Sequence, residues 1–264
     1  MGVLDLILRF TAGGLIGFTI GLTGIGGGVL VMPALIVLFK IPPSVSIGTA
    51  SLYALLTKIY ATFEHLKHKT VNLTTGIFFL IGAIPTNIIV SYLINDYIKQ
   101  TTDTLKIAQF QGCLKKGVIY ILIISVVLLI SQMIKSKKTD QKALSKIGGI
   151  ISGAVIGAVI GATSIGGGVL IIPLLIICFN LSAKETVGTS IFIAVILVFI
   201  TSIIYGKGGQ IDYWTSITMA AGSIPGVFWG SKLCVKISEK KLKLIITFII
   251  LIATTMMIFN NSGH

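Results

Sequence analysis

The chain has 264 residues, of which 54% are hydrophobic and only 11% are charged, and its mean hydropathy is +1.00. A soluble domain of this size cannot bury so much apolar surface, so the composition predicts an all-α protein that crosses a membrane several times. The formal net charge is +13, but the lysines cluster in short segments between apolar runs, as in membrane loops. Nucleic acid is therefore not expected as a partner.

Ten apolar runs follow one another along the chain. Two of them have only 12 residues, far fewer than the roughly 20 that a full crossing needs, and each of these two follows a Gly-Gly-Gly turn. We therefore predict that both short runs begin within the membrane and border a cavity, as part of a hairpin that either crosses twice or re-enters. The runs lie at 5–22, 28–39, 44–63, 73–95, 117–134, 147–162, 168–179, 185–205, 213–231 and 241–259.

Part of the sequence occurs twice. The segment TGIGGGVLVMP at 23–33 returns 140 positions later as TSIGGGVLIIP at 163–173, and the same offset relates the Gly-Thr pair at 48–49 to that at 188–189. We predict two repeats of five elements, at 1–134 and 147–264, joined by a basic linker at 135–146. A duplicated, glycine-broken apolar hairpin is typical of the substrate site of a secondary transporter.

The lysine distribution predicts how the repeats are oriented. The lysine-rich loops at 135–146 and 232–243 should both be cytoplasmic, so an even number of crossings separates them. If each short run forms a hairpin with its predecessor, each half has an odd net number of crossings and the two halves are inverted. The loop at 65–69 agrees with this topology, whereas the lysines of the loop at 96–116 argue against it.

The glycine triplets are the first candidates for substrate contact. Glycine lets a ligand approach main-chain N–H groups, and the helix that follows each triplet carries a partial positive charge at its amino end. Two such ends would bind a small anion without a charged side chain. Glycines spaced by four residues in the runs before them instead predict close helix packing. The six candidates are Gly26, Gly27, Gly28, Gly166, Gly167 and Gly168.

Hydroxyl groups near the triplets are the second set of candidates. They can donate hydrogen bonds to an anion, or they can cap helices and bond to the preceding helical turn. The set is Thr23, Thr49, Ser51, Thr163, Ser164, Thr189 and Ser190.

Two further polar residues lie inside apolar runs. Lys58 could attract an anion into the pathway, or its long side chain could extend to the membrane surface. Asn87 must face protein or a cavity because its amide is costly in lipid, and its counterpart in the second repeat is Val227. His65 and His68 are expected in a solvated loop.

Several functions are disfavoured. The acidic residues lie near predicted ends or in loops, which argues against a cation carrier with acidic ligands. We find no nucleotide-binding glycine loop and no catalytic pair, so we expect neither an enzyme nor a cofactor or metal.

The duplicated pattern Gly-x-Gly-Gly-Gly-x-x-x-x-Pro, at 24–33 and with serine first at 164–173, resembles the sulfite exporter TauE/SafE family, which is also called the toluene-sulfonate uptake permease-like family. The resemblance covers essentially the whole chain. It implies a multi-pass secondary carrier in a bacterial or archaeal cytoplasmic membrane that moves sulfite, thiosulfate or an organosulfonate by alternating access. The partners would be a small anion and the lipid bilayer, with self-association left open. The alternative is a channel or carrier for another solute, such as a metal cation or a neutral metabolite.

Overall fold

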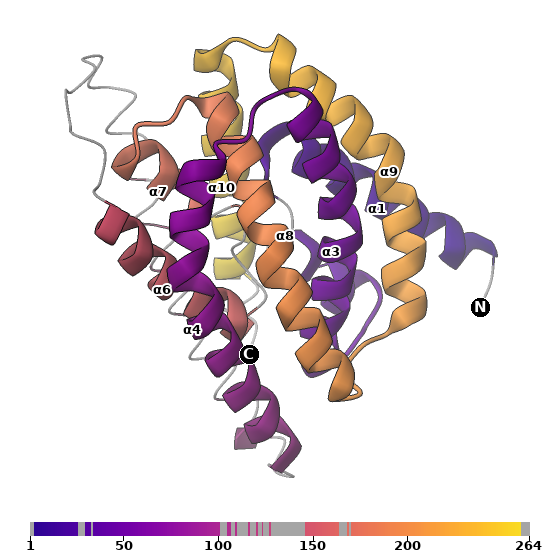
Figure 1. Ribbon diagram of the computed structural model, residues 1–264. Coiled ribbons are helices and arrows are strands. Elements are labelled where there is room, and N and C mark those ends of the chain that lie inside the picture. The colour runs from indigo at the N-terminus through magenta and orange to yellow at the C-terminus, as the bar shows by residue number, and fades with distance from the viewer. Residues whose placement is uncertain are drawn as a thin grey trace.

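The computed structural model describes residues 3–25, 30–32, 34–100, 146–163, 168 and 170–259, together with isolated residues between 105 and 127. Every regular element in these stretches is a helix (Figure 1). They are α1 (Val3–Thr23), the π-helix η1 (Ala34–Leu38), α3 (Pro43–Lys67), α4 (Leu73–Gln100), α6 (Lys146–Thr163), α7 (Ile171–Cys178), α8 (Ala183–Lys207), α9 (Tyr213–Lys236) and α10 (Glu239–Phe259).

These helices agree with the predicted apolar runs. The helix α7 has eight residues, which at 1.5 Å per residue is far too short to cross a bilayer, and the run at 28–39 is likewise divided into short pieces. Within the described stretches, three helices are long and apolar enough to cross a membrane on their own: Val3–Thr23, Leu73–Tyr97 and Ala183–Lys207. The predicted helix at 117–134 and the linker lie outside the described residues, except for a few isolated positions and Lys146, which begins α6.

The helices α3 and α8 pack against each other in the middle of the molecule (Figure 1). On one side of this central pair, α9 packs on α3 and also pairs with α1; on the other side, α4 packs on α8 and also pairs with α6. The first helix of each predicted repeat thus packs against the fourth helix of the other one. This exchange interlocks the two halves.

Glycine makes the two outer pairs possible. A Cβ atom at Gly13 on α1 would lie 2.0 Å from the Met219 carbonyl oxygen on α9. In the same way, a Cβ at Gly153 on α6 would lie 2.0 Å from the Phe79 carbonyl oxygen on α4. Each contact is the 140-residue equivalent of the other. The predicted role of these glycines in close helix packing is confirmed, because only a residue without a side chain allows the backbones to approach this closely.

The starts of α4, α8 and α9 are fixed by side-chain caps. Ser182 and Glu185 form a capping box at the start of α8. Asp212 accepts a hydrogen bond from the Thr215 amide at the start of α9, and Asn72 accepts one from the Thr75 amide at the equivalent point of α4, both at 3.1 Å. These caps satisfy amides that have no partner within their own helix.

Candidate functional site

The helix α1 ends at Thr23, and Gly24 follows it in the first copy of the duplicated motif. The Gly24 amide donates to the Ile20 carbonyl at 2.8 Å, and the Gly24 φ of +72° is a left-handed conformation that favours glycine. The buried Thr23 hydroxyl donates to the Thr19 carbonyl at 2.7 Å and accepts a bond from the Ile25 amide at 3.2 Å. In this structure Thr23 therefore shapes the end of the helix.

The two glycine segments meet at this point. A Cβ atom at Gly168 would lie only 2.0 Å from the carbonyl oxygen of Gly24 and 2.9 Å from the Ile25 Cα. Residues from the two copies of the motif, far apart in the chain, are thus in direct backbone contact. The other glycines of the triplets and Ser164 lie outside the described residues, as does the side chain of Thr163, the last residue of α6.

The helix α8 forms another wall of this contact. A Cβ at Gly24 would lie 2.6 Å from the Ser190 hydroxyl oxygen and 3.3 Å from the Val187 carbonyl. The Ser190 hydroxyl donates to that same carbonyl at 2.8 Å. The predicted hydroxyl of Ser190 is thus placed directly against Gly24.

Lys58 points to the same backbone. Its side chain is fully buried, and its ammonium donates to the Gly24 carbonyl over 3.4 Å, which is long for a hydrogen bond. Within the described part of the chain this is its only hydrogen bond. The interpretation that Lys58 extends to the membrane surface is therefore wrong: α3 carries it into the protein interior and not towards an end of the helix.

His65 lies one heptad after Lys58 on α3 and is also fully buried. Its Nε2 is 2.9 Å from the Gly21 carbonyl on α1, and its Nδ1 is 2.9 Å from the Thr70 hydroxyl. The expectation of a solvated loop histidine is wrong, because α3 continues to Lys67 and turns this face towards α1. Two basic side chains of α3 thus contact carbonyls at the carboxyl end of α1, where the helix dipole favours positive charge.

Thr49, Thr189 and Ser51 have structural partners. The Thr49 hydroxyl accepts a hydrogen bond from the Asp212 amide at 2.9 Å, and the Thr189 hydroxyl accepts one from the Asn72 amide at 2.8 Å. Each of these bonds joins the third helix of one half to the turn before the fourth helix of the other half. The Ser51 hydroxyl donates to the carbonyl four residues earlier, Ile47, at 2.9 Å. The bonds between the halves explain a hydroxyl at both equivalent positions without a substrate.

Asn87 is buried between helices. Its amide nitrogen lies 3.3 Å from both the Gly157 carbonyl on α6 and the Thr201 hydroxyl on α8. The predicted requirement for a polar partner is confirmed, and the protein itself supplies that partner. Its predicted contact with substrate stays a prediction.

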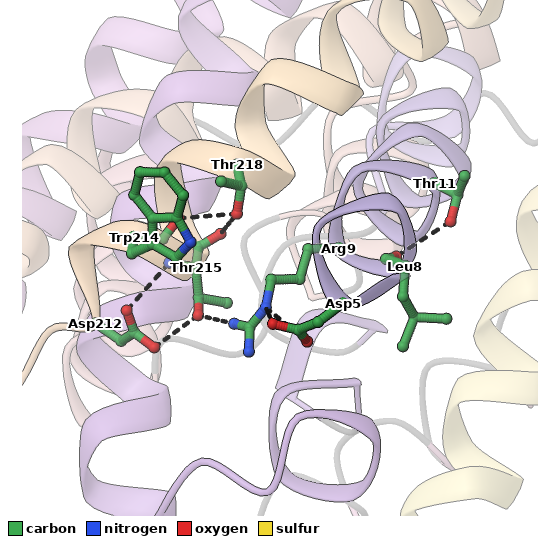
Figure 2. A network of polar contacts seen from close by, with 8 residues as sticks. All are labelled: Asp5, Leu8, Arg9, Thr11, Asp212, Trp214, Thr215 and Thr218. Carbon is green, nitrogen blue, oxygen red and sulfur yellow. Dashed lines mark hydrogen bonds and ion pairs between the residues drawn. The ribbon is translucent and has the colours of Figure 1, made fainter. Parts of the chain in front are cut away.

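A buried arginine joins helices at the amino end of α1 (Figure 2). The guanidinium of Arg9 donates to both Asp5 carboxylate oxygens at 3.1 Å and to the Thr215 hydroxyl, and it lies 4.7 Å from the centre of the Phe39 ring. The Thr215 hydroxyl donates in turn to Asp212 at 2.6 Å. Arg9 and Asp5 form an ion pair in this network, whereas Lys58 has no charged partner among the residues that the structure describes.

Two outward-facing hollows lie on the described surface, away from these contacts. One is lined by apolar residues of α1 together with Thr218 and Ala221, and the other lies mainly between α3 and α8 around Phe199 and Tyr213. Neither hollow includes Lys58 or Gly24. Gly24 and Gly168 are themselves buried.

The sequence did not lead us to predict that His65 and Thr70 lie with Lys58 beside the end of α1. The signal was the spacing of seven residues between Lys58 and His65, which places two side chains on one helix face. Assigning His65 to a loop hid that spacing, because the apolar run ends two residues before it.

Comparison with known proteins agrees with this architecture. The model of the sulfite exporter TauE/SafE family matches residues 9–257. The chain is 31% identical over 249 residues to the probable membrane transporter protein YjnA of Bacillus subtilis, covering 90% of this chain and 94% of that protein. It is 28% identical over 248 residues to the probable membrane transporter protein MJ0441 of Methanocaldococcus jannaschii, covering 86% and 85%. No solved structure matches the chain.

The fold and these matches define a helical membrane protein of transporter type. The chain belongs to the sulfite exporter TauE/SafE family, as the duplicated glycine motif predicted.

Proposed function

We propose that this protein is a secondary transporter that moves a small sulfur-containing oxyanion, such as sulfite, thiosulfate or an organosulfonate, across the cytoplasmic membrane. The observation that carries the proposal is the buried ammonium of Lys58 at the meeting point of the two glycine segments. The family name supports the choice of a sulfur oxyanion, and the transporter descriptions of the relatives support a carrier and not an enzyme.

The buried ammonium of Lys58 favours the binding of an anion beside it. Burying an ammonium costs several kcal/mol unless opposite charge or good hydrogen bonds offset it, and a single bond of 3.4 Å to a carbonyl offsets little. A bound anion would supply the missing partner. A cation would be repelled by the same ammonium, which argues against the alternative of a metal-ion carrier.

Anion recognition would combine Lys58 with main-chain donors. In this proposal the N–H groups of Gly26, Gly27 and Gly28 and of their counterparts Gly166, Gly167 and Gly168 point to the anion, with Ser190 beside them. The contact of Gly168 with Gly24 supports this arrangement, because it brings the two copies of the motif to one place.

Transport would proceed by alternating access between two inverted repeats, residues 1–134 and 147–264, joined by the linker at 135–146. Paired contacts at an offset of 140 support a repeat, among them those of Gly13 and Gly153 and those of Thr49 and Thr189. The complete burial of Lys58 is consistent with a state that is closed to both sides of the membrane.

Purified protein reconstituted into liposomes tests the proposal. Sulfite, thiosulfate, taurine and an aromatic sulfonate are the probes, with sulfate for comparison, and at least one sulfur oxyanion should show saturable uptake and counterflow. The same anion should stabilise the protein against heat, by about 2.7 kcal/mol at a hundredfold excess over its dissociation constant. Flux that neither saturates nor shows counterflow would indicate a channel, and the lack of any anion response would refute the proposal.

A further inference from the structure

We infer that His65 is the proton-binding residue that couples anion transport to protons, with its Nδ1 taking up one proton when an anion binds beside Lys58 and releasing it when the anion leaves. The inference rests on the proposed function and adds a coupling ion to it. The hydrogen-bond partners of His65 can accommodate both the neutral and the protonated ring.

The Nε2 atom must carry a proton in either state. Its partner at 2.9 Å is the Gly21 carbonyl oxygen, which can only accept. A neutral His65 therefore has a bare Nδ1 atom. The Nδ1 atom needs a hydrogen-bond donor as its partner when the ring is neutral, and a hydrogen-bond acceptor when the ring is protonated.

The Thr70 hydroxyl can either donate a hydrogen bond to Nδ1 or accept one from it. Its oxygen is 2.9 Å from Nδ1 and 3.0 Å from the main-chain carbonyl of His65. If the hydroxyl proton points to Nδ1, the ring is neutral and satisfied. If the hydroxyl turns to the carbonyl, its oxygen accepts the new Nδ1–H of an imidazolium. The ring can therefore gain or lose a proton by one hydroxyl rotation, without movement of heavy atoms.

The charges around His65 link this proton to the anion. Lys58 on α3 and His68, which directly follows α3, are its electrostatic neighbours, and His68 lies 3.8 Å from the Glu64 carboxylate. Burial and the Lys58 ammonium disfavour a second positive charge, whereas the carboxyl end of α1 favours it. An anion next to Lys58 removes much of the repulsion. By thermodynamic reciprocity, a proton on His65 must then strengthen anion binding by the same factor.

Charged groups on the other elements packed against His65 have partners elsewhere or, like Lys207 on α8 and Lys236 on α9, are exposed. On α1, Asp5 and Arg9 bond to each other at the opposite end of the helix. On α8, Lys184 donates to the Val235 carbonyl and Glu185 belongs to the capping box; on α9, Lys232 lies over the Phe228 ring. Among the described residues, the charges near His65 are therefore those of Lys58 and of the Glu64–His68 pair, together with whatever binds beside Lys58.

Thr70 lies between an exposed residue of the turn after α3 and the helix α8. It follows the exposed Lys69 in the turn after α3, so water can deliver a proton close to its hydroxyl. A Cβ at Gly188 on α8 would lie 2.6 Å from the same hydroxyl oxygen, two residues before Ser190. Proton binding therefore takes place at the contact between α3 and α8, beside the proposed anion site.

A titration of His65 tests the inference directly. The chain has three histidines, so full-length protein carrying His68→Gln and His264→Gln leaves His65 as the only imidazole for ¹⁵N NMR. We expect thiosulfate to shift the midpoint of His65 protonation to higher pH by about one unit, which is a tenfold coupling. If thiosulfate stabilises the protein against heat but leaves the His65 midpoint unchanged, the coupling is refuted while the proposed function stands. If no anion probe stabilises or crosses, the proposed function itself fails and the coupling falls with it.

Transport in liposomes gives a second readout with matched controls. An inward proton gradient should drive thiosulfate accumulation by the wild type and by His68→Gln. His65→Gln should still exchange thiosulfate, at a reduced rate, but should lose the gradient-driven accumulation. Thr70→Val should behave like His65→Gln, and Thr70→Ser, which keeps the hydroxyl, like the wild type. Accumulation that persists in both folded His65→Gln and folded Thr70→Val protein would overturn the inference.

Discussion

The two halves of the molecule share a framework but differ in their buried chemistry. On the framework, the contact of Gly13 with α9 recurs as that of Gly153 with α4. Inside, the position of Lys58 is taken by Val198 in the second half, and that of His65 by Tyr205. Tyr205 keeps the geometry, since its hydroxyl donates to the Gly161 carbonyl at 3.5 Å just as His65 contacts Gly21.

This difference shows what each part of a duplicated membrane protein must preserve. Helices that touch through their backbones tolerate no side chain at the contact, so the glycines must remain in both copies. A small anion needs only one ammonium, and a second buried charge would add a desolvation cost without a second ligand. Charge can therefore be concentrated in the first half while the framework stays paired.

The largest effect should come from giving the second half the charge of the first. Val198 is 2% exposed on α8, so Val198→Lys would bury an ammonium at a position that packs an apolar side chain. We expect a loss of about 3–5 kcal/mol in the free energy of unfolding, measured by thermal denaturation in detergent. Val198→Met adds length without charge and should lose much less. Equal losses in the two variants would mean that size, not charge, separates the halves at this position.

The framework can be tested by one methyl group in each half. Gly13→Ala and Gly153→Ala should each destabilise the protein by about 1–3 kcal/mol, because the helix pair must separate to admit the Cβ. Gly149→Ala is the control on the same helix as Gly153, since its Cβ would meet the Phe179 ring at an ordinary 3.4 Å. A large difference between the two test variants, in melting temperature, would contradict a symmetric framework.

Removing the charge of the first half should separate stability from transport. Lys58→Met should weaken anion binding at least tenfold, or about 1.4 kcal/mol, through loss of a buried charge partner. The melting temperature without substrate should stay the same or rise, because the variant removes a buried charge that has no charged partner in the described part of the chain. Lys67→Met, an exposed lysine on the same helix, should change neither quantity. Unchanged anion affinity in folded Lys58→Met protein would remove Lys58 from the site.

The smallest effect is expected at Tyr205. Tyr205→Phe removes a long hydrogen bond to Gly161 and should cost about 0.5–1 kcal/mol of stability. It should leave the pH dependence of transport intact, in contrast to His65→Gln. Loss of that pH dependence in Tyr205→Phe would show that the two equivalent positions act together, and would weaken the assignment of the proton to His65.

Much of the helical architecture was predictable because apolar length and glycine patterns act locally. The runs at 73–95 and 185–205 correspond to α4 and α8, and the brevity of the run at 168–179 to α7. The packing partners of the helices were harder to predict, because a repeat alone does not say whether α1 packs within its own half or against α9. Hydroxyl roles were ambiguous for the same reason: Thr49 and Thr189 bond to turns that are distant in the chain.

By itself, the sequence determined a helical membrane protein of the TauE/SafE family, since composition, helix length and the doubled glycine motif depend on neighbouring residues. Only the tertiary structure decided that Lys58 and His65 face the end of α1 and that Gly168 meets Gly24. The reason is physical: the burial of a side chain depends on which helices surround it. Those neighbours come from segments that can lie more than a hundred residues away along the chain.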